Sequence, residues 1–172
     1  MATITHMRPS SPGFTLVELM VVISIVGVLA ALAVPSLREL ALSQYVRSGA
    51  SDLQTALFFA RSEAIKRAAC VSVVPASSAW QNGWTVAVES APGACDGAGG
   101  VLRRQNALSD QLSAISGSAI TYRLDGRVTA TPAQIVFKTA NTKVIARCVS
   151  VDLSGRASVI YDTDGVASNG CN

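Results

Sequence analysis

The sequence predicts an α+β protein in which one long N-terminal helix packs on a C-terminal antiparallel β-sheet domain. Two observations predict this class. An apolar run and then a helical apolar pattern occupy the first part of the chain, and short β-branched segments separated by turn residues follow Cys70. One helix followed by a series of strands is typical of α+β domains. The expected parts are a leader (1–13), an apolar helix segment (14–37), an amphipathic helix (38–68) and the sheet domain (69–172).

The run from Phe14 to Leu37 is long and apolar enough to cross a membrane. As a helix it would extend about 36 Å, against a hydrocarbon core of about 30 Å. Its single ionisable side chain is Glu18. A charge inside such a span costs about 2.5–3.5 kcal/mol on insertion scales and therefore points to a function.

The leader, residues 1–13, contains Arg8 and His6 and no acidic residue. A positive flank before an apolar span keeps the N-terminus in the cytoplasm, so we expect a single-pass protein whose domain lies beyond the membrane. The alternative is a secretory signal peptide cut after Ala33, at a small-residue site. Glu18 at the head of the run, and the length of the run, favour a retained membrane helix.

The head of this run resembles the N-terminus of type IV pilins and of the pseudopilins of type II secretion. The resemblance rests on Gly13, Phe14, the TLVEL stretch from residue 15 to 19 that contains Glu18, and Pro35. It implies that a prepilin peptidase cuts after Gly13 and that the new amine of Phe14 is methylated. It also implies that Glu18 meets the Phe14 amine of a neighbouring subunit during assembly in the inner membrane.

The helix is expected to continue past Leu37 as an amphipathic segment. Apolar residues recur at spacings of three and four and form one face, which we expect to pack on the sheet: Val46, Ala50, Leu53, Leu57, Ala60 and Ala64. Charged residues are expected on the opposite, solvent face: Arg47, Asp52, Arg61, Glu63 and Lys66. Pro35 removes one backbone hydrogen bond inside this long helix, so we expect a kink there.

Strands are expected in the second half wherever β-branched residues cluster between turn residues. These segments are Val71–Val74, Trp84–Glu89, Val101–Gln105, Ile120–Leu124, Gln134–Phe137, Val144–Asp152 and Ala157–Tyr161. The glycine-containing sequences at 125–127 and 153–156 predict tight turns.

The four cysteines, Cys70, Cys95, Cys148 and Cys171, all follow the span and would lie in an oxidising compartment. Three pairings are open. We favour Cys148 with Cys171, which would tie the tail to the sheet, and Cys70 with Cys95, which would close the first hairpin region.

A narrower resemblance links the chain to the GspH/FimT group of minor pilins and pseudopilins. It rests on the segments 59–67, 71–73 and 83–86 and on the later hairpin at 148–156. The resemblance implies a FimU-like minor pilin of a type IV pilus that helps to prime assembly. The alternatives are the H-type pseudopilin of a type II secretion system and a FimT-like subunit that binds DNA during transformation. The partners implied are other pilins, the prepilin peptidase and the inner-membrane assembly platform.

DNA binding is the less favoured alternative. FimT-like subunits use a Gly-Arg-x-Arg motif, whereas this chain has Gly155-Arg156-Ala157-Ser158 and lacks the second arginine. The formal net charge of +3 is also too small to indicate a polyanion partner. Basic residues do outnumber acidic ones between 97 and 160, and the candidate DNA contacts are Arg156, Arg147 and Lys143.

No enzymatic, cofactor or metal site is expected. The single histidine lies in the leader, and no CxxC spacing occurs. Asp162 and Asp164 are spaced like the beginning of a calcium loop, but the later ligands of an EF-hand do not follow. We therefore interpret them as part of a surface turn. The sequence as a whole indicates a structural and assembly protein.

Overall fold

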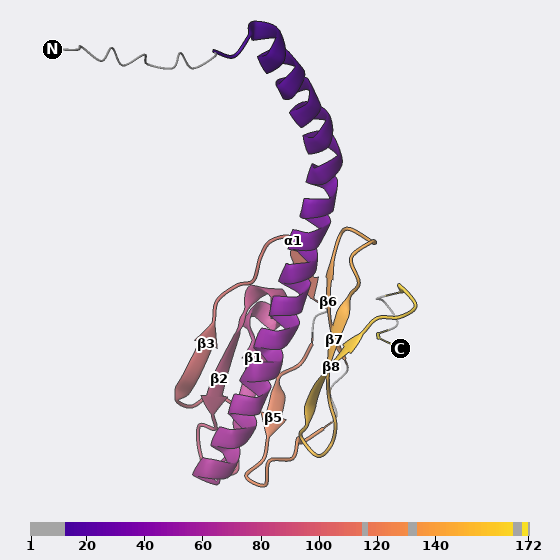
Figure 1. Cartoon of the computed structure of the whole chain (residues 1–172). Coiled ribbons are helices and arrows are strands. Elements are labelled where there is room, and N and C mark those ends of the chain that lie inside the picture. The colour runs from indigo at the N-terminus through magenta and orange to yellow at the C-terminus, as the bar shows by residue number, and fades with distance from the viewer. Residues whose placement is uncertain (1–12, 115–116, 131–133, 167–169, 172) are drawn as a thin grey trace, which may run out of the picture. The chain divides into compact units, whose positions relative to one another are not determined.

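The N-terminal part of the described chain forms a single helix, α1 (Leu16–Arg67). The computed structural model describes residues 13–114, 117–130, 134–166 and 170–171 (Figure 1). The described chain divides into two units, one up to Arg38 and one from Glu39 onward. Apart from Gly13, the expected leader lies outside the described residues.

The second part of α1 buries one stripe of its surface. The buried residues repeat at spacings of three and four, as expected for one face of a helix: Leu42, Val46, Gly49, Ala50, Leu53, Ala56, Leu57, Ala60, Glu63 and Ala64. All six apolar positions predicted for this face are therefore confirmed. At Gly49 a β-carbon would lie 3.3 Å from both Leu108 Cδ1 and Phe137 Cδ1, so glycine allows the helix to approach the strands closely.

Eight strands follow the helix and form two antiparallel sheets. Sheet A has the strand order β3-β2-β1-β5, and sheet B has the order β4-β6-β7-β8. The strands are β1 (Val71–Pro75), β2 (Trp84–Val88), β3 (Val101–Gln105), β4 (Leu112–Ala114), β5 (Ile120–Tyr122), β6 (Ile135–Thr139), β7 (Arg147–Val151) and β8 (Ala157–Tyr161).

The α+β class is confirmed, and the division of the strands into two sheets goes beyond the sequence-based prediction. Each expected segment overlaps a strand. The prediction missed β4, whose three residues carry too short a pattern to be recognised. It also began β7 too early, because a turn in which the Val144 amide donates to the Asn141 carbonyl (3.1 Å) precedes that strand. Two 3₁₀ turns, 76–78 and 80–82, connect β1 to β2.

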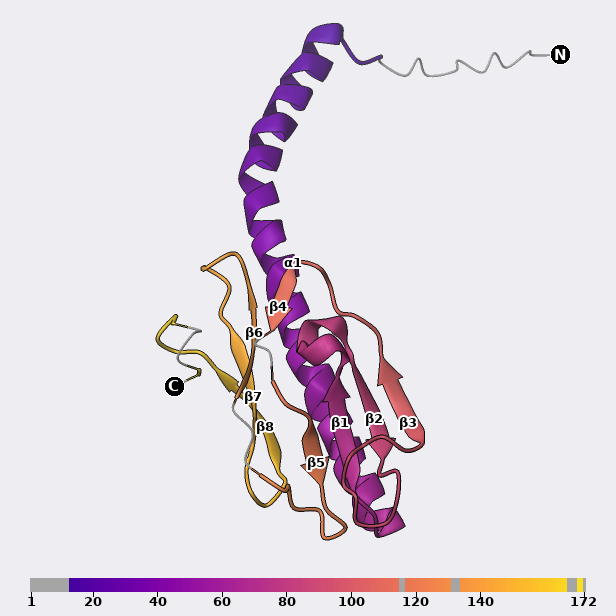
Figure 2. The same cartoon turned by 180° about the vertical axis from the view of Figure 1, so that it is seen from behind.

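The core lies between α1 and the inner faces of both sheets. Within the second unit, the helix lies in front of the strands in Figure 1, and the strands lie in front of the helix when seen from behind in Figure 2. The largest buried side chains come from all three parts, for example Leu53 of α1, Tyr122 of β5 and Phe137 of β6. Burial of this kind of side chain contributes about 1.5–3 kcal/mol each.

Arg61 of α1 joins the helix to a turn from each sheet. Its Nε donates to the Gly126 carbonyl in the turn after β5 (3.0 Å), and its Nη2 donates to the Ser154 carbonyl in the β7–β8 turn (3.0 Å). The two turns also touch each other, because a β-carbon on Gly155 would overlap the Gly126 carbonyl. We call Arg61 and these two turns (123–127 and 152–156) the clasp.

Two charged residues of α1, Arg61 and Glu63, do not lie on the solvent face where the sequence analysis expected them. Arg61 does not project freely into solvent, because both turns of the clasp present carbonyl oxygens to it. Glu63 is only 9% exposed, and its carboxylate accepts a hydrogen bond from Arg67 Nε at 2.6 Å. This hydrogen bond, together with Lys66 at 3.7 Å, holds the pKa of Glu63 below its usual value.

Both disulfides form with the favoured pairing. Cys70 pairs with Cys95, joining the start of β1 to the loop after β2. Cys148 of β7 pairs with Cys171, so the tail is tied to sheet B. Gln134 supports this attachment, since the Cys171 amide donates to its Oε1 at 2.8 Å.

The contact within the clasp predicts that Gly155→Ala destabilises the protein. Gly155 has a φ of +80°, and the new methyl group would also meet the Gly126 carbonyl and approach Tyr122 Cε1 to 3.0 Å. We expect a loss of about 2–4 kcal/mol in the free energy of unfolding, measured by urea denaturation of the full chain in detergent micelles.

Gly165→Ala is the matched control for this substitution. Gly165 has a similar φ of +73°, but nothing lies within 4 Å of its added β-carbon. Backbone strain alone should cost about 1–2 kcal/mol there. Equal losses in the two variants would show that the contact between the turns contributes nothing.

Candidate assembly site

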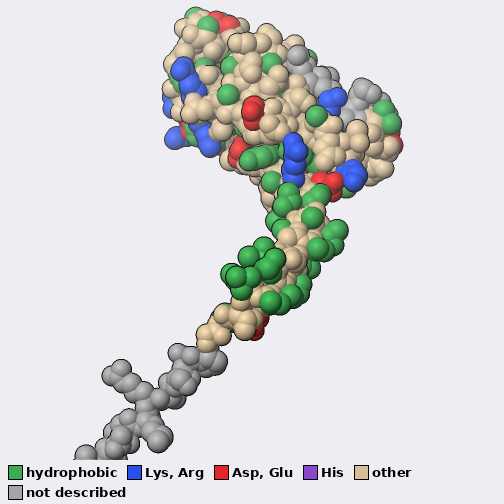
Figure 3. Space-filling view, turned by 90° about the horizontal axis from the view of Figure 1, so that it is seen from above, with side chains coloured by type: hydrophobic (Ala, Val, Ile, Leu, Met, Phe, Trp, Pro, Cys, Tyr) green, Lys and Arg blue, Asp and Glu red, His purple; other side chains and the backbone are tan. Residues whose placement is uncertain are grey.

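The first part of α1 exposes its apolar side chains along its whole length. Every residue from Gly13 to Arg38 is exposed, and Phe14, Leu16 and Leu32 are 82%, 75% and 74% exposed. In Figure 3 hydrophobic side chains surround this part of the helix. Among the described residues, α1 is the one helix long and apolar enough to cross a membrane. A surface of this kind is stable only when lipid or other apolar chains cover it.

Glu18 lies in the first turn of this helix. The Thr15 hydroxyl accepts a hydrogen bond from the Glu18 amide at 3.2 Å, and the Thr15 carbonyl accepts one from the Leu19 amide at 3.2 Å. Thr15 is therefore the N-cap, and the Thr-x-x-Glu spacing is that of a capping box. A carboxylate in the first turn is also favoured by the helix dipole.

The sequence interpretation overlooked this cap, although the Thr-x-x-Glu pattern can be recognised without a structure. The cap fixes the first turn, so that the Glu18 side chain projects from an ordered helix end. Glu18 remains exposed there, and it is the single ionisable side chain between Phe14 and Leu37. An exposed carboxylate on an apolar surface is available to a cation from another molecule.

Among the described residues, nothing in the structure requires glycine at position 13. An added β-carbon would meet none of their atoms within 4 Å, and Gly13 is not among the residues with positive φ. At Pro35 the helix continues without interruption, so the expected kink stays a prediction.

The three candidate DNA contacts do not form one cluster. Arg147 and Arg156 lie at opposite ends of the β7–β8 hairpin, because Arg147 pairs with Tyr161 while Arg156 follows the turn. Each also has a partner: Arg147 stacks on the Tyr161 ring at 4.4 Å, and Arg156 Nε lies 3.9 Å from Asp152. Lys143 Nζ lies 3.4 Å from Glu39 of α1.

The clasp brings together a different set of basic residues. Arg127 follows Gly126 and Arg156 follows Gly155, so the contact between the two glycines brings these arginines into adjacent turns. Asp152 orders the second turn by accepting hydrogen bonds from Ser154 Oγ (2.5 Å) and the Arg156 amide (3.0 Å). These hydrogen bonds hold the pKa of Asp152 below its usual value. The sequence alone did not single out Arg127, because its neighbour comes from the other sheet.

Within the described residues, one group has the composition of a metal site: Cys70, Glu89 and Cys95. Its two sulfurs form a disulfide and are therefore not thiolate ligands. Glu89 accepts backbone hydrogen bonds from Gly93 (2.9 Å) and Cys95 (3.3 Å). This group therefore holds the loop after β2 in place.

An exposed apolar helix with one carboxylate in its first turn, continuing into a helix that backs antiparallel sheets, defines a type IV pilin-like protein. The prokaryotic N-terminal methylation motif matches residues 8–34, and the family described as type II transport protein GspH matches residues 49–155. The chain belongs to this GspH family. It is a pilin-like structural protein of the minor pilin and pseudopilin group, a group that is not known to have enzymatic activity.

Two solved structures share the fold. Both are crystal structures of the type IV minor pilin FimU from Pseudomonas aeruginosa, in two crystal forms. The first has a TM-score of 0.55 and 20% sequence identity, and the aligned region covers 66% of this chain and 87% of the FimU chain. The second has a TM-score of 0.53 and 20% sequence identity, and the aligned region covers 66% of this chain and 90% of the FimU chain. No curated protein sequence matches the chain.

Family membership defines the general role of the apolar helix. Members of this family assemble with other pilins into filaments, and the N-terminal helix anchors them in a membrane. The exposed residues 14–37 are therefore the part of the protein that lipid or neighbouring helices cover.

Proposed function

We propose that this protein is a minor pilin of a type IV pilus that is incorporated into the filament and helps to prime its assembly. It inserts in the inner membrane with its N-terminus in the cytoplasm and its sheet domain in the periplasm. A prepilin peptidase cuts between Gly13 and Phe14, and the Phe14 amine is methylated. The assembly platform then transfers the helix into the filament. The methylation motif and the FimU-like fold support this proposal.

One observation carries the proposal: the single carboxylate at the head of a fully exposed apolar helix. Transfer of an ionised Glu18 into an apolar surrounding costs about 2.5–3.5 kcal/mol if it stays unpaired. The new amine at Phe14 would carry the opposite charge, and it would lie within about one helical turn of Glu18. Pairing Glu18 with the Phe14 amine of a neighbour offsets the cost of burying each of the two charges. Such a pair forms only where two subunits meet in the correct register.

The H-type pseudopilin of a type II secretion system is the second form of this proposal. The name of the matching family, type II transport protein GspH, favours it, whereas the similarity to FimU favours a pilus. Both forms require the same cleavage, methylation and helix packing. The genes beside this one distinguish them, since pilus genes support the first form and secretion genes the second.

A DNA-binding role is a further candidate because of the clasp. The motif position that would hold a second arginine is Ser158, but Arg127 lies in the turn that touches the Arg156 turn. Two arginines from neighbouring turns present the positive charges that a phosphate backbone needs. Arg147 and Lys143, at the other end of β7, are outside this surface.

The first prediction concerns processing. The mature protein should begin at Phe14 with a methylated amine, as read by N-terminal sequencing and peptide mass. Gly13→Val should block the cut, while Gly27→Val should not. Glycine is exposed at both positions, and no atom lies within 4 Å of an added β-carbon, so neither valine should clash with its surroundings. A mature protein that begins at Val34 would show a signal peptide instead.

The second prediction concerns assembly. Glu18→Ala and Glu18→Gln should insert in the membrane as the wild type does, but both should be lost from sheared filaments, because the charge that pairs with the Phe14 amine is gone. Glu39→Ala removes a carboxylate from the same helix beyond the apolar run and should be incorporated normally. Immunoblots of membrane and filament fractions measure both steps. Normal incorporation of the Glu18 variants would refute the proposed pairing.

The third prediction tests DNA binding by gel shift with the full chain in non-ionic detergent at stated salt concentrations. If the clasp binds phosphates, Arg156→Ala and Arg127→Ala should each weaken binding, and each should lower the slope of log K against log salt by about one. Arg147→Ala is the matched control and should change neither quantity. Absence of binding by the wild type at low salt would end this candidate role.

A further inference from the structure

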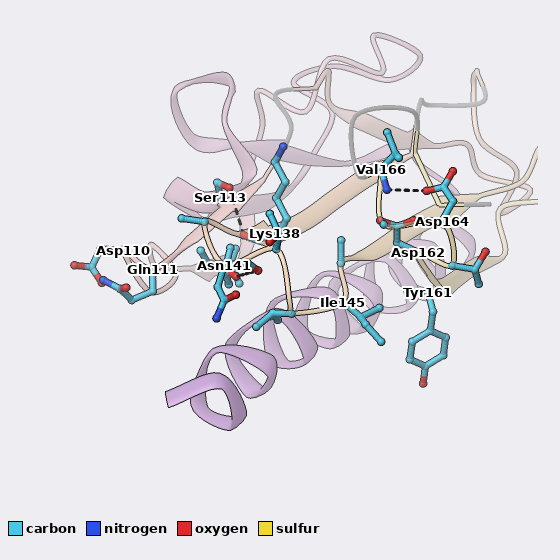
Figure 4. A pocket seen from close by; sticks show the side chains of 18 residues that line it. Asp110, Gln111, Ser113, Lys138, Asn141, Ile145, Tyr161, Asp162, Asp164 and Val166 are labelled. Atoms are coloured by element: carbon cyan, nitrogen blue, oxygen red, sulfur yellow. Dashed lines mark hydrogen bonds between the residues drawn. The ribbon is translucent and has the colours of Figure 1, made fainter. Parts of the chain in front are cut away.

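A large cavity lies at one end of sheet B. It has a volume of about 1180 Å³ and lies between β4, the loop that follows β6, and the segment that follows β8. Figure 4 shows Asp162, Asp164 and Val166 together on one side of it, with Asp110 on the far side. Tyr161 and Ile145, which are 53% and 62% exposed, contribute apolar surface to the lining.

Asp162 does not lie in a surface turn, which corrects the sequence-based expectation. It is only 7% exposed, and its amide donates to the carbonyl of Ala146, the residue before β7, at 3.1 Å. Its Oδ1 is buried and accepts no hydrogen bond. A buried carboxylate oxygen without a donor is costly, and native proteins usually satisfy such a group with a proton, a water or a cation.

The basic residues around this cavity do not compensate Asp162. Lys138 contributes to the lining, and Arg147 lies beside it on the Tyr161 ring. The ion pairs of Glu63, Glu39 and Asp152 do not include Asp162. The carboxylate of Asp164, two residues along, adds a second negative group on the same side of the cavity.

We propose that Asp162 and Asp164 bind a divalent cation, with calcium as the preferred ion. Two carboxylates supply the oxygen ligands that hard cations prefer, and the open cavity leaves room for water at the remaining positions. Calcium tolerates the irregular geometry of such a site better than magnesium does. With two carboxylates, the affinity should lie in the range of extracellular modules, with a dissociation constant of about 10⁻⁴–10⁻³ M.

The site is independent of the filament role, because it lies entirely in the second unit and uses no residue of the apolar helix. A bound cation would satisfy the buried Asp162 oxygen. It would also order residues 162–166, which connect β8 to the disulfide-linked tail. Calcium would therefore stabilise the part of the surface that β8 and the tail present to neighbouring molecules.

The test is thermal unfolding of the full chain in non-ionic detergent micelles, after removal of metal by chelation. Calcium chloride at about ten times the dissociation constant should raise the melting temperature by about 2–5 °C. Magnesium at the same concentration should raise it less. Terbium luminescence gives a second readout, because Tyr161 is adjacent to Asp162 and can sensitise a bound ion; Tyr161→Phe should reduce that signal.

Three variants assign the calcium response to Asp162 and Asp164. Asp162→Asn and Asp164→Asn should abolish the response to calcium, and the exposed Asp164 provides the variant that does not disturb the core. Asp110→Asn removes a carboxylate from the far side of the same cavity and should keep the response. A wild type without any response would overturn the proposal. A response that survives in both Asp162→Asn and Asp164→Asn, or that is lost in Asp110→Asn, would overturn it as well.

Discussion

The buried stripe of α1 between Leu42 and Ala64 is the surface on which the rest of the domain is built. The alanines of this stripe and Gly49 have small side chains or none, so that strands from both sheets approach the helix closely. Close packing of this kind contributes dispersion and burial energy from many small contacts. Arg61 then projects from the edge of the stripe and satisfies a carbonyl from each sheet. The two sheets therefore form one domain because they share this helix and meet at its clasp.

The same helix has two parts with opposite requirements. From Leu42 onward its own sheets cover the apolar face, whereas none of the described residues covers residues 14–37. Each large apolar side chain left in water forgoes about 1.5–3 kcal/mol, so this surface must be covered by lipid or by other helices. A pilin-like protein uses both surroundings in turn. Glu18, whose amide is held by the Thr15 cap, is the one ionisable group between Phe14 and Leu37, and the proposed pairing with a neighbouring amine depends on it.

The fold was largely predictable because its signals are local. The six apolar residues that the periodicity of three and four placed on one helix face are all buried, although Leu42 and Ala56 of the same face were not named. Clusters of β-branched residues located all strands but the short β4. The errors concern charged residues whose burial or long-range contacts cannot be recognised in a local sequence pattern. Arg61 and Glu63 were placed on the solvent face, and Asp162 was assigned to a surface turn. In each case the environment of the side chain depends on the tertiary structure, which the local sequence pattern does not reveal. Arg127 was overlooked for the same reason, since its neighbour Arg156 belongs to the other sheet.

The sequence by itself determined the apolar helix with Gly13, Phe14 and Glu18 at its head, the α+β class, and the four cysteines placed beyond the span. These features depend on composition and short spacing, which the linear chain contains in full. The tertiary structure decided which cysteines pair, how eight strands divide into two sheets, and which charged groups are buried. Those outcomes depend on contacts between residues far apart in the chain. They are determined only when the helix and both sheets pack together in one closely packed interior.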